Sequence, residues 1–529
     1  MRVPTASRQR QRVAAVAAAW PHLAPIAIAA IALALRMHGL GDKPFWLDEV
    51  VSFRRATVPF AEVIAASVQN NHYPSYFLLL WLVAKIGTSQ WLLRLPSAIF
   101  GALGAGLVCL IGREADGLRT GIAAGLLLAL SPFDVQYGQE ARSYTLVASL
   151  ILVALWGLVR LGRDPALAAR PLRIDRLPPG AWLAYGGGTA AALNVLNVAV
   201  GWLLAANLAA LVIACRSGDA RRTFLRNWGI VQGLVVAAWL PALVAVLAAS
   251  KNGLLAVAGW APTESLASIW AVAAPVYLDR IAAFITFDLL PPTVPGLSIV
   301  IAVLAAAGAW RLLRREPNAF AIIGSAGIGV PLLLLLVSLY KPILVPRYFG
   351  WSAAPFFVLA GAGVAHLKAR YFAAGAATLT VACLINLLPY YSDETKPRWD
   401  LLAAQLQQQV HDGDVVLLNN WYADYVMQAF VDRTGLADRR LVLTSHPRKA
   451  VAALLPHHNL WVVYGRAGQA VLPTPSQYMN SLSALGRPSD EQRFGRYVVL
   501  WRLTPDALAG DCTAAPAGSP PQPATGNPC

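Results

Sequence analysis

The sequence predicts a polytopic α-helical membrane protein that ends in a small α/β domain. The chain is 57% hydrophobic and only 13% charged, and its mean hydropathy is +0.53. It contains charge-free runs such as GALGAGLVCLIG and VPLLLLLVSLY, and a membrane span needs about 20 apolar residues. From about residue 392 helices alternate with short apolar strands, which is typical of an α/β domain.

The formal net charge of +16 comes from arginine and lysine residues in short loops between the apolar runs. Membrane proteins place such loops on the cytoplasmic side, so the charge favours a membrane protein over one that binds nucleic acid. The N-terminal MRVPTASRQRQRV holds four arginines and no acid, and an apolar run follows to about residue 36. This pattern predicts a signal-anchor as the first span, with a cleaved signal peptide as the alternative. Either one sends residues 40 onward outside.

The basic loops give a direction to each of eleven expected spans. After the signal-anchor, the spans are expected at about 96–112, 119–133, 144–161, 181–215 (two spans), 228–249, from 296, from 319, from 350, and at 372–390. They form a transmembrane module over 1–391, whose first outer segment is 40–95. The run at 73–87 is interpreted as a helix in the outer interface, because a twelfth span there would put the charged motifs on opposite sides. The partly apolar segment 250–295 is also expected at the interface.

Residues 392–508 predict an extracytoplasmic α/β domain, because they follow an outward span. The runs DVVLLNN, RRLVLTS, LWVVYGR and GRYVVLWRL indicate its strands. The Pro-, Ala- and Gly-rich tail 509–529 holds Cys512 and Cys529, which either form a disulfide or lie in a disordered terminus. The other cysteines, Cys109, Cys215 and Cys383, lie in apolar runs and are interpreted as small packing residues.

The expected topology gathers the unexplained charges on the outer side. The candidates are Asp48 and Glu49; His72 and Tyr73; Glu140, Arg142 and Tyr144; and Lys341, Arg347 and Tyr348. Ionised groups near a membrane are costly, so they usually pair or line a watery cavity. An acidic pair facing several cations suits an anionic lipid-linked substrate and a neutral nucleophile that needs a base.

Each candidate also has a simpler interpretation. The acidic pair could lie in a surface loop, and Arg142 could be paired with Glu140. Arg94 is expected to anchor a helix end by reaching to the interface, and Lys341 could do the same. Other function classes stay open: a transporter or flippase, which would carry charges in mid-span and inverted repeats; a lipid-pyrophosphate oligosaccharide ligase; and a scaffold whose α/β domain binds partners.

Five motifs in order carry a resemblance to a known family. They are FWLDEVVS, HYPSYFLLLW, WLLRLPSAIFG, SPFDVQYGQEARSYTL and PRYFGWSAAPFFVLAGAG. The set resembles bacterial members of glycosyltransferase family 39, polytopic enzymes of the GT-C fold class related to protein O-mannosyltransferases and to the lipid A aminoarabinose transferase. The resemblance covers residues 40–160 and is supported again at 340–365.

The resemblance implies that a sugar is transferred from a polyprenyl-phosphate donor to a lipid, glycan or protein acceptor at the outer face of a bacterial inner membrane. The family's catalytic base falls on Asp48, with Glu49 beside it. Arg142 and Arg347 would then hold the phosphate. Many relatives carry lysine in the element that here reads NHYPS, so a phosphate contact there would fall on His72.

An inverting displacement needs a carboxylate on the nucleophile's side of the sugar ring. Glu49 or Glu140 would orient an arginine or a sugar hydroxyl. No cofactor is required by this scheme, although Asp48, Glu49 and His72 could hold a divalent cation. Relatives also show a Thr-His-Tyr-like element where this chain has LNVLNVAVGW.

Overall fold

A computed structural model describes residues 6–172, 178–249, 265–282, 289–339, 345–434, 442–454, 458–465, 473–485 and 488–503. The chain separates into two compact units. The helical unit comprises the described residues of Met1–Leu40, Ser52–Ala282 and Leu289–Ser392. The α/β unit comprises Gly41–Val51 and the described residues of Asp393–Cys529. The expected tail 509–529, with Cys512 and Cys529, lies outside the described residues.

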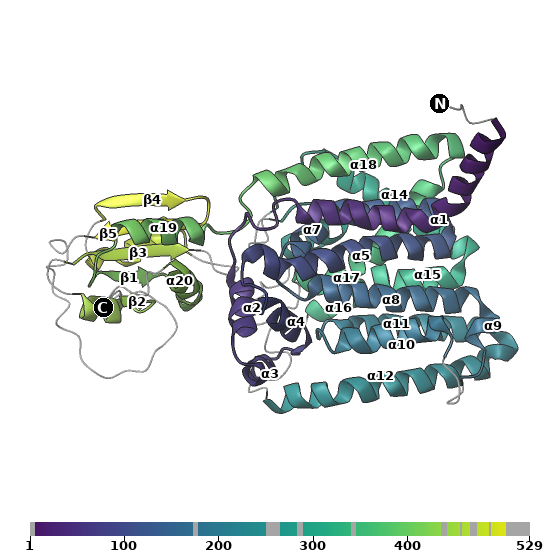
Figure 1. Ribbon diagram of the computed structural model, residues 1–529, viewed down its shortest axis with the longest axis horizontal. Helices are drawn as coiled ribbons and strands as arrows, with labels where there is room; N and C mark the ends of the chain where they lie inside the picture. The colour runs from purple at the N-terminus through teal and green to yellow at the C-terminus, as the bar shows by residue number, and fades with distance from the viewer. Residues whose placement is uncertain are drawn as a thin grey trace. The chain divides into compact units, whose positions relative to one another are not determined.

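The helical unit is built from long helices that run back and forth, with shorter ones at their ends (Figure 1). Its helices are α1 (Ala6–Met37), α2 (Leu47–Thr57, whose first residues belong to the α/β unit), α3 (Phe60–Gln69), α4 (Ser75–Ala84), α5 (Gln90–Asp116), α6 (Leu118–Leu130), α7 (Pro132–Gly138), α8 (Tyr144–Arg163), α9 (Pro165–Ala168), α10 (Gly180–Leu193), α11 (Ala199–Arg216), α12 (Arg221–Ala249), α13 (Leu266–Tyr277), α14 (Leu297–Arg315), α15 (Pro317–Gly324), α16 (Val330–Ser338), α17 (Pro346–Ala365) and α18 (Ala369–Ser392). A π-helical turn, Ser325–Gly329, joins α15 to α16.

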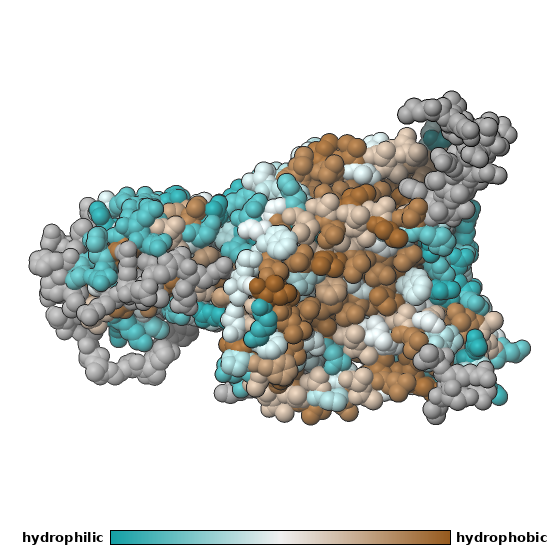
Figure 2. Space-filling view, viewed as in Figure 1, coloured by the Kyte–Doolittle hydropathy of each residue, from teal (hydrophilic) through white to brown (hydrophobic). Residues whose placement is uncertain are grey.

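Every segment in which we expected a span is helical. Within the described residues, eight helices are long and apolar enough to cross a membrane, and the bent pair α6–α7 raises the number to nine. The two other expected spans are α1, described as an apolar helix over Pro21–Met37, and α10, which has 14 residues. Figure 2 shows the apolar surface that these helices present. A multi-pass membrane protein is therefore confirmed, and the number eleven stays a prediction.

The short helix α4 supports the interpretation of residues 73–87 as an element that does not span the membrane. It has 10 residues. At a rise of about 1.5 Å per residue it covers about 15 Å, half of the hydrocarbon thickness.

Ion pairs bring the expected inner loops to one end of the helical unit. Arg163, at the end of α8, lies 3.7 Å from Glu316, which precedes α15. Arg311, in the last turns of α14, pairs with Asp116 at the end of α5 at 2.9 Å. Three loops that the charge pattern assigns to the same side therefore meet.

The sixth helix is interrupted at a proline. Ser131 has an extended backbone, with ψ near 119°, because the residue before a proline is disfavoured in the α region. Its hydroxyl caps the next helix by accepting from the backbone N–H of Asp134. The axes of α6 and α7 differ by 60°.

A buried arginine of α1 stabilises this break. Arg36 donates to the carbonyl oxygens of Leu128 and Ala129, at 3.4 and 3.2 Å, in the last turn of α6. The carbonyl oxygen of Leu128 also accepts from the backbone N–H of Ser131, because Pro132 cannot donate to it. Its guanidinium also pairs with Asp134 at 2.6 Å, and the Arg36 side chain is 0% exposed. Gly138 leaves room for it, since a Cβ there would clash with the arginine side chain.

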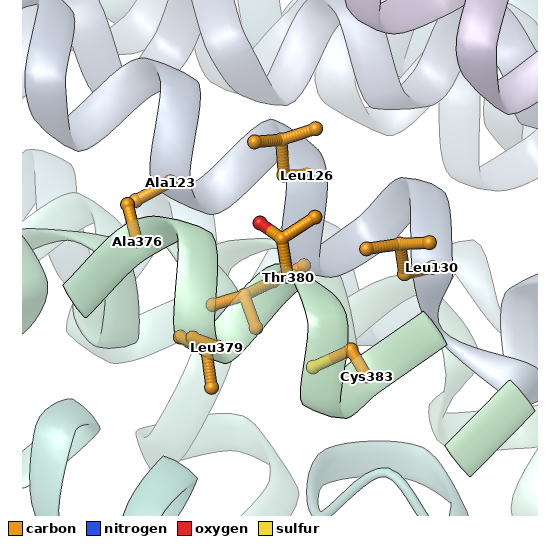
Figure 3. A pocket seen from close by; sticks show the side chains of 8 residues that line it. Ala123, Leu126, Leu130, Ala376, Leu379, Thr380 and Cys383 are labelled. Atoms are coloured by element: carbon orange, nitrogen blue, oxygen red, sulfur yellow. The ribbon is translucent and has the colours of Figure 1, made fainter. Parts of the chain in front are cut away.

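Two of the three cysteines in apolar runs are buried, as expected, but Cys215 is exposed. It lies near the end of α11. The buried Cys383 lines a small apolar pocket between α6 and α18, with Ala123, Leu126, Leu127, Leu130, Ala376, Leu379 and Thr380 (Figure 3). The pocket has few polar atoms and holds none of the expected site residues.

The α/β unit contains a five-stranded mixed sheet in the order β2-β1-β3-β5-β4. Its elements are α19 (Trp399–Gln409), β1 (Val415–Leu418), α20 (Trp421–Thr434), β2 (Val442–Thr444), α21 (Pro447–Ala453), β3 (Leu460–Gly465), α22 (Pro475–Ser481), β4 (Asp490–Phe494) and β5 (Val498–Leu503). Strands β2, β1 and β3 are parallel, whereas β5 is antiparallel to both β3 and β4.

The central strands are buried on both faces. All residues of β1 and β3 are buried, which explains their continuous apolar text. On one face, α21 and α22 complete a core with Val415, Val462 and Trp501. Four of the strands lie in the runs that indicated them, but β4 was missed because DEQRF is mostly polar and largely exposed at the sheet edge.

Close packing of α14 against α17 should be a main source of stability in the helical unit. A Cβ on Gly308 would clash with the backbone of Leu359, and one on Gly363 with the backbone of Leu304. Small residues let helix backbones approach in membranes, where van der Waals packing drives association.

We therefore expect Gly308→Ala to lower the apparent melting temperature of the detergent-purified protein by several degrees, an effect of about 1–3 kcal/mol. Gly233→Ala is the matched control, because a Cβ at that helical position meets nothing within 4 Å. Equal melting temperatures for the two variants would contradict this account.

Candidate functional site

The two adjacent carboxylates of the first turn of α2 lie in different surroundings. Neighbouring helical residues point about 100° apart, so Asp48 and Glu49 cannot share one face. Asp48 is partly buried. Glu49 is fully buried, and its carboxylate accepts from Nζ of Lys396 at 2.8 Å. Glu49 is therefore held in a structural ion pair, whereas Asp48 retains contact with solvent.

Lys396 is not among the site residues that the sequence predicted. It follows the last span in the text SDETKPRWD. A second lysine, Lys43, donates to the hydroxyl of Thr395 at 2.7 Å and to the carbonyl oxygen of Asp393 at 3.3 Å. These contacts join two stretches that are some 350 residues apart. The signal in the sequence was a lysine shortly after the last span, in a segment rich in charged residues.

The NHYPS element has one half-exposed and one buried ring. Nδ1 of His72 lies 2.5 Å from the carbonyl oxygen of Asn70, and the imidazole packs edge-on against Phe77. Tyr73 is 1% exposed. Its hydroxyl accepts from the indole N–H of Trp239 at 2.9 Å, and burial raises the pKa of this phenol. Tyr73 therefore packs against α12 as a neutral group.

The segment between α7 and α8 is held against α5 by hydroxyl groups. Ser97 donates to the carbonyl oxygen of Arg142 at 2.9 Å, and the hydroxyl of Tyr76 lies 2.8 Å from that of Ser97. Thr145 donates to the carbonyl oxygen of Ser97 at 3.0 Å. Because these contacts fix the backbone on both sides of Ser143, the side chains at the start of α8 are held in place.

Within this segment, Arg142 and Tyr144 are in contact. The guanidinium of Arg142 lies 3.5 Å from the phenol oxygen of Tyr144 and 5.6 Å from the centre of its ring. Glu140 is fully buried, two residues before the arginine.

A small cavity of about 20 Å³, which opens to solvent, lies next to Tyr144. It is lined by Phe133, Asp134, Tyr137, Tyr144, Thr145, Val147, Ala148, Val198, Arg347, Gly350 and Trp351. The guanidinium of Arg347 is 5.8 Å from the ring of Tyr348. Two expected residues from distant parts of the sequence, Tyr144 and Arg347, are thus brought to one cavity.

The cavity lies beside the N-termini of two helices. Tyr144 is the first residue of α8, and Arg347 is the second residue of α17. Unpaired N–H groups give a helix N-terminus a partial positive charge that favours anions. Arg347 and four aromatic rings line the cavity together with Asp134, whose carboxylate is paired with Arg36. The opening beside Arg347 can therefore receive a phosphate next to an apolar or sugar-like body.

One expectation for the charged residues is wrong in the structure. Arg94 does not reach to an interface: it is 1% exposed and donates to the carbonyl oxygen of Leu40 at 2.9 Å. A guanidinium can be buried in this way when it satisfies backbone carbonyls between packed helices. Lys341 lies outside the described residues. Within those residues, no three His, Cys, Asp or Glu side chains are close enough together to hold a metal ion.

The comparisons with known proteins agree with this architecture. Residues 71–246 match the family model described as dolichyl-phosphate-mannose-protein mannosyltransferase, which is about a third of the chain. No curated protein matches the chain.

Three solved structures have a similar fold. Apo ArnT from Cupriavidus metallidurans is 13% identical with a TM-score of 0.54, over 92% of this chain and 98% of ArnT. ArnT from the same organism bound to undecaprenyl phosphate is 14% identical with a TM-score of 0.50, over 92% and 99%. The apo oligosaccharyltransferase of Archaeoglobus fulgidus is 11% identical with a TM-score of 0.51, over 84% of this chain and 70% of that protein.

At these identities the structural likeness shows the fold. Together, the family model and the fold confirm the class that the sequence motifs indicate. The chain has the fold of membrane glycosyltransferases of the GT-C type, and about a third of it matches a glycosyltransferase family model similar to family 39.

The buried ion pair of Glu49 predicts a specific pattern of stability. Glu49→Gln should lower the free energy of unfolding by about 3–5 kcal/mol, because it leaves the ammonium of Lys396 buried without its counter-charge. The double variant with Lys396→Met should recover much of this loss. Thermal unfolding of the purified single and double variants checks the prediction.

The control is Arg398→Ala, which removes a partly exposed pair with Asp400 and should cost less than about 1 kcal/mol. Additive losses for Glu49 and Lys396 would contradict the coupling.

Proposed function

We propose that this protein transfers a sugar from a polyprenyl-phosphate donor to an acceptor hydroxyl on the extracytoplasmic face, with inversion at the sugar. The observation that supports this proposal best is the cavity that Tyr144 and Arg347 line together. One of the solved structures of similar fold, ArnT, is bound to undecaprenyl phosphate.

The donor phosphate is held at the start of α17. Arg347 offers a forked donor to its oxygens, and the N-termini of α8 and α17 add partial positive charge. Negative charge grows on this phosphate as the glycosidic bond breaks, so donors already in place stabilise the transition state more than the ground state. Arg142 acts through Tyr144, whose phenol oxygen it contacts.

Asp48 is the general base of this scheme. Of the two adjacent carboxylates, Glu49 is neutralised by Lys396, whereas Asp48 keeps its solvent contact. In the reaction the acceptor oxygen forms a bond to the anomeric carbon, and the bond from that carbon to the phosphate oxygen breaks. The phosphate leaves with the electron pair, and Asp48 takes the proton of the acceptor hydroxyl.

Asp48→Asn is expected to lower kcat for sugar transfer by roughly 10²–10⁴-fold, the usual contribution of a general base. Folding and membrane insertion should be unchanged, because Asn keeps the shape of the side chain. The measurement is transfer by purified protein in nanodiscs, with labelled polyprenyl-phosphate sugars as donors. The matched control is Asp400→Asn, in which a partly exposed carboxylate is changed. Near-normal turnover of Asp48→Asn would refute the assignment of the base.

Arg347→Ala should raise KM for the donor at least tenfold and leave KM for the acceptor within about twofold, since one charge-assisted hydrogen bond is worth about 1.5–3 kcal/mol. Arg347→Lys should recover part of the loss, because it restores the charge without the fork. Arg314→Ala is the control, because that guanidinium lies on the ring of Trp310, at the other end of the helical unit. An unchanged donor KM in Arg347→Ala would exclude a phosphate contact.

The choice of donor in the transfer assay also distinguishes the proposed reaction from that of a lipid-pyrophosphate oligosaccharide ligase. A transferase for single sugars uses polyprenyl-monophosphate donors, whereas a ligase requires an oligosaccharide on a pyrophosphate. Transfer only from the pyrophosphate donors would replace the proposed reaction by the ligase reaction.

A further inference from the structure

The α/β unit has an exposed aromatic pair directly after its first strand. Trp421 is 60% exposed, although a side chain of this size is usually well covered. Its ring is stacked on that of Tyr422, with centroids 3.8 Å apart and planes 28° apart. Tyr422 therefore backs one face of the indole and fixes its orientation. A large apolar ring held outward in this way is typical of a contact surface.

The topology of the sheet places this pair at the edge where α/β domains bind ligands. From β1 the chain passes through α20 to β2 on one side, and then through α21 to β3 on the other side of β1. The connections that leave β1 and β3 therefore lead in opposite directions along the sheet. The carboxyl ends of these two neighbouring strands form a switch point. Ligands of open α/β sheets bind outside the carboxyl ends of strands at such a switch point.

Amide side chains stand beside the aromatic pair at the same edge. Asn419 directly follows β1, and its Oδ1 accepts from the backbone N–H of Gly465, the last residue of β3, at 3.2 Å. Asn420 directly precedes α20, and its Oδ1 caps this helix by accepting from the backbone N–H of Ala423 at 2.9 Å. The amide nitrogen of Asn420 has no hydrogen-bond partner among the described residues, although it is shielded from solvent.

The strand register extends the polar edge to β2. Leu417 is opposite Thr444, so Asn419 and His446 each follow two positions later on neighbouring strands. His446 is exposed. The four residues from Asn419 to Tyr422 carry no formal charge, which makes them poor ligands for a phosphate and suitable ones for a neutral polyhydroxylated molecule.

We infer that residues 419–422 form a binding site for a neutral saccharide. The less polar C–H face of a pyranose ring packs on the open face of Trp421, and its hydroxyls exchange hydrogen bonds with Asn419, Asn420 and His446. The inference rests on the proposed function only in naming this saccharide the acceptor of the sugar. Because the ring and the amides are held in place before binding, little entropy is lost when the ligand is ordered.

Binding is tested without any transfer reaction. Full-length protein in nanodiscs is applied to an array of bacterial surface oligosaccharides, in the absence of lipid donor. We expect the wild-type protein to retain at least one oligosaccharide, Trp421→Ala to lose at least tenfold in its apparent affinity, and Trp421→Phe to stay within about threefold. Trp310→Ala is the matched control, because Trp310 is 57% exposed on the apolar helix α14. No retained oligosaccharide, or equal binding by wild type and Trp421→Ala, would overturn the inference.

Two further measurements separate the possible causes of failure. Asp48→Asn should bind the array like the wild type, so the base assignment and the saccharide site can fail independently. Insertion of Trp421 into lipid is tested by its emission, taken as the difference between wild type and Trp421→Phe, in nanodiscs with brominated lipids. Strong quenching of that difference would assign Trp421 to the bilayer surface and overturn the saccharide site.

Discussion

The arrangement of the helical unit depends on the buried ion pair between Arg36 and Asp134. A proline interrupts the sixth helix, and a broken helix inside a membrane protein leaves carbonyl groups that need partners. The guanidinium of Arg36 supplies donors to two of them and a counter-charge to Asp134, within one side chain. Gly101 and Gly138 leave the room that this large group requires.

The consequence of the break is the cavity. Because α7 turns away from α6 by 60°, Phe133, Asp134 and Tyr137 face the start of α8 and line the cavity with it. The three residues share one face of α7, and the bend between α6 and α7 turns that face toward the start of α8. The donor site of the proposed reaction therefore depends on an arginine that does not line the cavity itself.

A second buried pair separates the roles of the two adjacent carboxylates. Glu49 and Lys396 are both almost completely removed from solvent, and such a pair persists only when each charge satisfies the other. Pairing makes Glu49 a structural residue, whereas Asp48 is only partly buried. Arg94 also has a structural contact, because its guanidinium donates to the carbonyl oxygen of Leu40 within the helical unit. Residue type and spacing predicted that the two carboxylates lie near the outer cations, but could not identify Glu49 as the one that is buried against Lys396.

The sequence by itself determined the positions of the helical segments, the change to an α/β unit near residue 392, and the class of glycosyltransferase. These properties depend on apolar length, on the placement of arginines and on short motifs, all of which are local in the chain. Only the tertiary structure decided that Lys396 pairs with Glu49, that Arg36 supports the broken helix, and that Tyr144 and Arg347 share one cavity. The partners in each of these contacts lie between about 90 and 350 residues apart, and the burial that selects a partner exists only after the chain has packed.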